Sequence, residues 1–167
     1  MKTINFTIAF VLLLSMLVSC TKKQENEQYA YVAATIGTSQ FSSSGTSVNV
    51  GEDPTPAQGG AIGGQEQVTI TSESNASTGT DKDYLVITFG YNPGDIKSYS
   101  VQNREAICAY HKSGSNGDDI ALTGTVTITN NGVLDGVLGK HLHGTFNFTT
   151  QKGINVSNGT FSVQVNN

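Results

Sequence analysis

The sequence predicts an all-β domain, built as a single antiparallel β-sandwich or, alternatively, as a partly open β-barrel. Charged residues make up only 13% of the chain, and glycine is abundant at 19 residues while proline is rare at 3. Short segments alternate apolar and polar side chains with a period of two, as half-buried strands do. No segment beyond residue 20 has a helical period. Roughly eight or nine strands joined by turns therefore make up the domain.

The first half of the domain alternates apolar segments with polar turns. We expect strands, in order, at Tyr29–Ile36, around Phe41, at Ser47–Val50, at Gln67–Thr71 and at Asp83–Phe89. Residues 54–56 read Pro-Thr-Pro, which predicts a loop because proline fixes φ and the residue before it avoids the helical region. The Gly-, Ser- and Thr-rich segment 37–64 therefore connects short strands.

Two features in the middle of the chain predict particular strand arrangements. The turn at residues 92–95, Asn-Pro-Gly-Asp, predicts a hairpin into a strand at Ile96–Val101. Glu105–Tyr110 is apolar at successive positions, so we expect a central strand that is covered on both faces.

The C-terminal third has the clearest alternation. Leu122, Val126 and Ile128 occupy one face of a strand. We expect this strand to end at Asn131-Gly132, a residue pair that tolerates positive φ.

The last two predicted strands differ in whether their inward apolar residues have even or odd numbers. Leu142, Phe146 and Phe148 share the inner face of the first of them. In the second, the apolar positions change from even to odd across Asn158-Gly159. An extra residue is needed to turn the side chains around, so the change predicts a β-bulge there.

The chain opens with an export signal. Lys2 gives a positive start, Phe6–Val18 is mostly apolar, and a small residue precedes Cys20; this is the pattern of a secretory signal peptide. Leu17-Val18-Ser19-Cys20 resembles the lipobox of bacterial lipoproteins, in which the cysteine sulfur is lipidated and the chain is cut before it. The alternative is an ordinary signal peptide with Cys20 at the cut site.

The lipobox resemblance implies a division of the chain and a location. Residues 1–19 would be the lipoprotein signal peptide, 20–28 a lipidated tether and 29–167 the β-domain. The protein would be anchored in the bacterial outer membrane, on the periplasmic face or at the cell surface. The formal net charge of −4 disfavours both nucleic acid and anionic headgroups as partners. Membrane attachment would therefore come from the lipid.

A second resemblance concerns the end of the chain. Gly144-Thr145-Phe146-Asn147-Phe148, followed by Val156–Val163, resembles the closing hairpin of a family of small Bacteroidetes lipoproteins of unknown function. The resemblance implies a lipidated β-sandwich domain. It implies no catalytic residue, because that family has no established activity.

Catalytic and metal-binding patterns are weak. Cys108 lies in an apolar segment with His111 three residues away, which a strand directs to the opposite face, so we predict a buried structural thiol. His141 and His143 share a strand face and are the candidates for a metal, although zinc needs three or four protein ligands. Asp118-Asp119 and Glu52-Asp53 lack the spacing of a calcium loop. We predict no cofactor, no resident metal and no enzymatic activity.

Tyrosines are the candidates for ligand binding, since an aromatic ring combines apolar area with a polar tip. They could stack on sugar rings if several gather on one exposed face; the candidates are Tyr84, Tyr91, Tyr99 and Tyr110. We therefore expect a non-catalytic binding or accessory domain for a glycan or protein partner. A structural component of an outer-membrane complex is the alternative, and an enzyme is the third possibility.

Overall fold

A computed structural model describes residues 30–53, 66–75, 81–92, 94–134 and 137–165. The predicted signal peptide, Cys20 and the tether lie outside these residues. The described chain forms ten strands and one short 3-10 turn, η1 (Gly45–Ser47). The strands are β1 (Tyr31–Ile36), β2 (Ser39–Ser44), β3 (Val48–Asp53), β4 (Glu66–Glu73), β5 (Tyr84–Tyr91), β6 (Ser98–Ser100), β7 (Ala106–His111), β8 (Asp119–Leu134), β9 (Val137–Thr150) and β10 (Asn155–Gln164).

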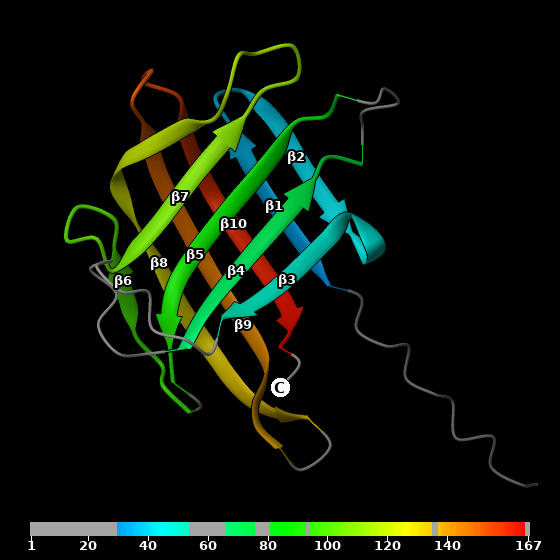
Figure 1. Ribbon diagram of the computed structural model, residues 1–167, viewed down its shortest axis with the longest axis vertical. Coiled ribbons are helices and arrows are strands. Elements are labelled where there is room, and N and C mark those ends of the chain that lie inside the picture. The colour runs from blue at the N-terminus through cyan, green and yellow to red at the C-terminus, as the bar shows by residue number, and fades with distance from the viewer. Residues whose placement is uncertain (1–29, 54–65, 76–80, 93, 135–136, 166–167) are drawn as a thin grey trace, which may run out of the picture.

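All strand pairs are antiparallel and belong to one sheet, in the order β2-β1-β10-β9-β8-β7-β5-β4-β3, with β6 paired to β8. The sheet curls until its two ends approach each other (Figure 1). Asn75, just beyond β4, joins them: its backbone N–H donates to the Ser42 carbonyl at 2.9 Å and its Nδ2 donates to Ser44 Oγ at 3.0 Å. The all-β prediction is confirmed. The single sheet forms a nearly closed barrel, which is the predicted alternative, and not the two packed sheets of a β-sandwich.

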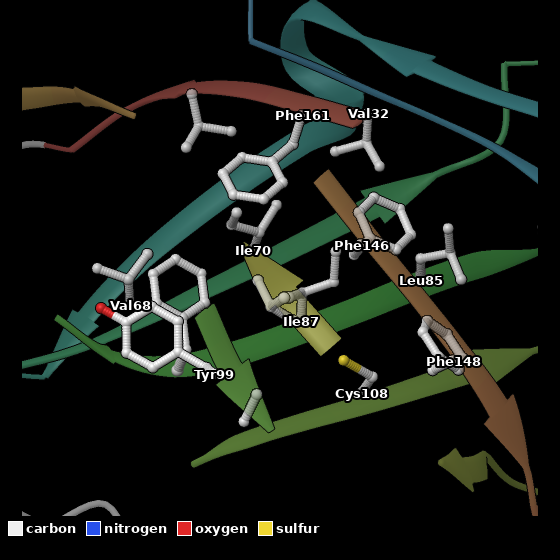
Figure 2. Close-up of a cluster of buried hydrophobic side chains, with 14 of the residues drawn as sticks. Val32, Val68, Ile70, Leu85, Ile87, Tyr99, Cys108, Phe146, Phe148 and Phe161 are labelled. Carbon is white, nitrogen blue, oxygen red and sulfur yellow. The ribbon is translucent and has the colours of Figure 1, made fainter. Parts of the chain in front are cut away.

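The barrel interior is the hydrophobic core. Inward residues of β4 and β5 face those of β1, β9 and β10 across it (Figure 2). The predicted period of two is confirmed on β4, β5, β9 and β10, where the apolar residues on the inner face are each at most 2% exposed: Val68, Ile70, Leu85, Ile87, Phe89, Leu142, Phe146, Phe148, Phe161, Val163 and Val165.

Glycines opposite phenylalanines allow the wall formed by β8, β9 and β10 to curl. Gly144 pairs with Phe161, Gly159 with Phe146, and Gly124 with Phe148. At Gly144 and Gly159 the facing ring occupies the space of a missing side chain: a Cβ would lie 2.3 Å and 2.5 Å, respectively, from ring carbons. Phenylalanine rings that cover cross-strand glycines thus account physically for the Gly-Thr-Phe repeats of this segment.

The predicted bulge at Asn158-Gly159 is confirmed. The β10–β9 register shifts between Val156 and Gly159, and Asn158 adopts a positive φ of 51°. The extra residue places Phe161 inside together with Val156, as the parity change requires.

Two predictions for β8 are wrong. Leu122 is 56% exposed, because the β8–β9 register shifts between Ala121 and Thr123 and Ala121 takes the inward position. The strand also continues through Asn131 to Leu134. Asn131 is buried, and its Nδ2 donates to the carbonyls of Asn92 and Asp95 at 3.1 and 3.0 Å.

Two predictions in the middle of the chain are also wrong. The turn at residues 92–95 does not form a hairpin, because β6 pairs with β8 and β5 pairs with β7. Strand β7 is not covered on both faces, because Ile107 is 51% exposed on the outer side. The run of apolar residues in β7 therefore belongs to a barrel strand with one face exposed to solvent, as strands of antiparallel sheets often have.

Candidate functional site

A pocket of about 260 Å³ opens at one end of the barrel. Its walls come from the β1–β2 turn, the segments that follow β4 and β7 and precede β5, and the β9–β10 turn. The lining residues are Ile36, Gly37, Ser39, Gln40, Phe41, Ser74, Asp83, Tyr110, Lys112 and Ile154. We call this the end pocket.

One wall of the end pocket is fixed by Asp83. Its Oδ2 accepts a hydrogen bond from the Tyr110 hydroxyl at 2.8 Å, and its Oδ1 accepts one from the backbone N–H of Ser113 at 2.8 Å. Burial and the bond to Asp83 raise the pKa of Tyr110. Both carboxylate oxygens accept hydrogen bonds, so Asp83 holds the start of the β7–β8 loop against the segment that precedes β5.

Beside the end pocket, His111 packs between two carboxylates. Its Nδ1 lies 3.1 Å from Asp118 Oδ1 and its Nε2 lies 3.6 Å from Asp81 Oδ1. Its ring stacks on Tyr84 with centroids 4.5 Å apart. The Tyr84 hydroxyl also donates to Asp118, and this bond is the main reason that the pKa of Tyr84 rises to about 12. These contacts join the β7–β8 loop to the segment that precedes β5, next to the pocket.

The pocket combines an apolar base with a polar rim. Phe41 is buried, and Ile36 and Ile154 pack partly buried against the core. Gln40 and Lys112 are exposed at the rim, where Gln40 Nε2 donates to Thr35 Oγ1 at 3.3 Å. Polar residues outnumber these three apolar side chains in the lining, so the pocket is more polar than a typical small-molecule site. Among the residues that the structure describes, those that line the pocket include no histidine or cysteine.

The four candidate tyrosines separate into two pairs. Tyr84 and Tyr110 lie at the pocket end, whereas Tyr91 ends the same strand that Tyr84 begins. Eight residues of strand span roughly 25 Å. Tyr91 and Tyr99 are 2% and 3% exposed and belong to the core, and burial raises the pKa of Tyr99 to about 12. The four tyrosines therefore do not share one exposed face on which a sugar ring could stack.

The other candidates also separate. Cys108 is 1% exposed, and burial raises the pKa of its thiol to about 12, as expected for a structural thiol. The Asp118 carboxylate accepts a hydrogen bond from the Tyr84 hydroxyl and contacts His111 Nδ1. Asp119 is buried and accepts hydrogen bonds from Thr150 Oγ1 at 2.6 Å and the Lys152 N–H at 3.2 Å.

The two carboxylates of Asp118 and Asp119 therefore serve different partners. The side chains of Glu52 and Asp53 lie outside the described residues. No group of three or more His, Cys, Asp or Glu in the described part of the chain is placed to hold a metal ion.

His141 and His143 lie together on the outer face of β9, with ring centroids 4.3 Å apart. His141 Nε2 is 3.2 Å from Ser162 Oγ. Burial and the neighbouring His143 lower the pKa of His141. The shared face predicted from their spacing is confirmed, at a site distinct from the end pocket.

No local sequence pattern predicts most of the end pocket. Its lining comes from five separate turns or strand ends, and residues such as Gln40, Ser74 and Lys112 are ordinary turn residues by composition. Of the lining residues, only Tyr110 is among the binding candidates predicted from the sequence. Strand pairing, not a local motif, brings the rest together.

Alkaline pH is expected to destabilise the protein. Tyr84 and Tyr99 have folded-state pKa values raised from 10.0 to about 12, and that of Cys108 is raised from 9.0 to about 12. In the unfolded chain these groups ionise nearer their ordinary values, so their contribution is fully present below pH 9 and is lost as the pH rises towards 12. The urea midpoint should be constant from pH 7 to 9 and fall between 9 and 12.

Tyr99→Phe provides the control for that experiment. The Tyr99 hydroxyl is buried and has no hydrogen-bond partner among the described residues, so its removal should not lower stability at pH 7. It should make the alkaline fall shallower. A midpoint that stays constant to pH 11 in the unsubstituted protein would contradict the prediction.

No protein-family model, curated protein or solved structure matches the chain. The fold and the end pocket thus define an antiparallel barrel-like domain with a polar-rimmed pocket at one end, and the resemblance to Bacteroidetes lipoproteins stays a prediction. Within the described ranges, no helix is long and apolar enough to span a membrane.

Proposed function

We propose that this protein is a lipid-anchored envelope lipoprotein whose barrel is a non-catalytic binding domain for a glycan, held in the end pocket. The observation that carries the proposal is the position of the pocket. Strand β1 begins at Tyr31 and ends at Ile36, which lines the pocket. The pocket therefore lies at the opposite end of β1 from Tyr31, which is close to where the described part of the chain begins.

The lining of the pocket favours a sugar. Sugar rings have an apolar C–H face and a polar edge, and Phe41, Ile36 and Ile154 can pack against the former. Gln40, Ser39 and Lys112 offer donors and acceptors for the hydroxyl groups. The volume of 260 Å³ is just below the roughly 300–1,000 Å³ of typical small-molecule pockets. One sugar unit of a longer glycan fits that size.

Glycan binding is tested on an array of bacterial and host glycans, followed by titration of the strongest ligand. Gln40→Ala and Lys112→Ala should each weaken binding by roughly tenfold, the loss expected from about 1.4 kcal/mol. Lys152→Ala is the matched control, since its exposed side chain does not line the pocket. An array without signal, or equal losses in control and rim variants, would refute the glycan assignment.

The anchor is tested separately through Cys20. Cells grown with labelled palmitate should incorporate label into the native chain and retain it in the membrane fraction, because two or more acyl chains anchor a protein stably. Cys20→Ser should abolish both the label and membrane retention. Unlabelled, soluble protein from both versions would exclude lipidation whatever the glycan array shows.

A second candidate function, assembly into an envelope complex, is favoured by an exposed apolar patch. Ile107, Ile120 and Leu122 are 51%, 48% and 56% exposed. Ile120 pairs with Ala109, two residues beyond Ile107, so both point outward on the β7–β8 wall. Contiguous apolar surface of this kind often marks a protein interface. Crosslinking should recover a partner with the native chain and much less of it with Leu122→Ser; recovery of the chain alone would exclude this role.

A further inference from the structure

We propose that His141 and His143 form a binding site for a Cu²⁺ ion on the outer wall of the barrel, separate from the end pocket. The two imidazoles project from the same face of β9, and their ring centroids lie 4.3 Å apart in an edge-on arrangement. Residues two apart in a strand are about 6.6–6.8 Å apart along the chain, so the rings already lean towards each other. The proposal requires that rotation about their side-chain torsions bring one nitrogen of each ring to a shared ion.

Oxygen donors flank this pair on both neighbouring strands. On β10, Ser162 pairs with His143, and Ser162 Oγ lies 3.2 Å from His141 Nε2. The Ser162 side chain is fully buried although it is on the outer face, because its neighbours cover it. A polar atom is thus held beneath the imidazoles.

The strand on the other side leaves space next to His141. Asn130 pairs with His143, and Gly132 pairs with His141. Gly132 has no side chain, and the Asn130 Oδ1 atom lies 3.4 Å from the point where a Cβ on Gly132 would be. A side-chain carbonyl oxygen therefore lies beside the two histidines, on the strand that pairs with β9.

This donor set selects copper among the common divalent metals. Zinc sites use three or four protein ligands from His, Cys, Asp and Glu, and the described residues place no third ligand of these types here. Two imidazole nitrogens completed by amide, hydroxyl or water oxygens form a mixed N,O set that suits the tetragonal geometry of Cu²⁺ or Ni²⁺. Copper binds most tightly of the first-row divalent ions to such ligands.

The test titrates the purified full chain with CuCl₂ in the presence of glycine as a weak competitor, with electron paramagnetic resonance as an independent readout. We expect one Cu²⁺ per chain with a micromolar Kd and an axial spectrum showing nitrogen ligation. His141→Asn and His143→Asn should each weaken binding by at least about tenfold and reduce the nitrogen couplings. His111→Asn is the matched control, since His111 lies at the pocket end among Asp81, Asp118 and Tyr84.

Several outcomes would overturn the site. Unchanged copper affinity in the double variant His141→Asn/His143→Asn would mean that the ion binds elsewhere. Absence of a bound-copper signal from the native chain would refute the proposed site. Zinc binding as tight as copper binding would contradict the two-imidazole assignment. Circular dichroism confirms that each variant is folded, and both histidines are only partly buried on the outer wall, so His143→Gln is available should His143→Asn disturb β9.

Discussion

Gly144→Ala is expected to destabilise the barrel by about 3 kcal/mol, the upper part of the range for overpacked cores. A Cβ on Gly144 would lie 2.3 Å from a ring carbon of Phe161 and 2.5 Å from the backbone carbonyl oxygen of Thr127. The ring can shift only within a closed core, and the carbonyl belongs to the β8 backbone. Strand β9 must therefore move away from a neighbour on either side, which strains pairing through the most tightly curled wall.

Urea denaturation measures this effect, and the melting temperature should fall by roughly 10 °C for a domain of this size. Gly51→Ala is the matched control. Gly51 lies on the edge strand β3, and a Cβ there would meet nothing within 4 Å. That change should be neutral or stabilise by about 0.4–1 kcal/mol, because alanine restricts the unfolded chain. Equal effects of the two substitutions would show that the Gly144–Phe161 contact is not tightly packed.

The regular strands were predictable because their side chains alternate without interruption. Ile70, Ile87 and Phe146 follow the period of two and are buried as expected. The bulge at Asn158-Gly159 was predictable for the same reason, since a change of parity leaves a visible trace in the apolar positions.

The bulge in β8 left no such trace. Leu122 fits the same parity as Val126 and Ile128, yet the register shift after Ala121 turns it outward. The small Ala121 takes the inward place, and hydrophobicity alone does not distinguish these two arrangements. A single inserted residue therefore changed the exposure of one leucine while the rest of the face was correct.

The pairing of strands that are far apart in the chain could not be predicted from the sequence. The turn signal at residues 92–95 was strong, but the strand that follows pairs with β8, whose partner residues Thr125–Thr127 lie about 27 positions further along the chain. The same difficulty applies to the end pocket. Phe41, Asp83 and Ile154 come from distant turns, and only closure of the sheet brings them together.

Phe161→Ala is expected to cost about 3–5 kcal/mol, as for other fully buried phenylalanines. Phe161 is 1% exposed, and its ring centroid lies 6.2 Å from that of Phe89 and 6.5 Å from that of Phe146. Phe89 is on β5 and Phe146 is on β9, so the Phe161 ring contacts both walls of the barrel. Its removal opens a cavity in the core and also uncovers Gly144.

The same residue allows the glycine contact to be separated from the core contact. In the double variant Gly144→Ala/Phe161→Ala the clash with the ring disappears while the clash with the Thr127 carbonyl stays, so the combined loss should be smaller than the sum of the single losses by about 0.5–3 kcal/mol. Leu122→Ala is the control, because a leucine that is 56% exposed should cost less than about 1 kcal/mol. Strict additivity of Gly144→Ala and Phe161→Ala would mean that the ring does not fill the space above the glycine. A loss under about 1 kcal/mol for Phe161→Ala would mean that the two walls do not share one packed interior.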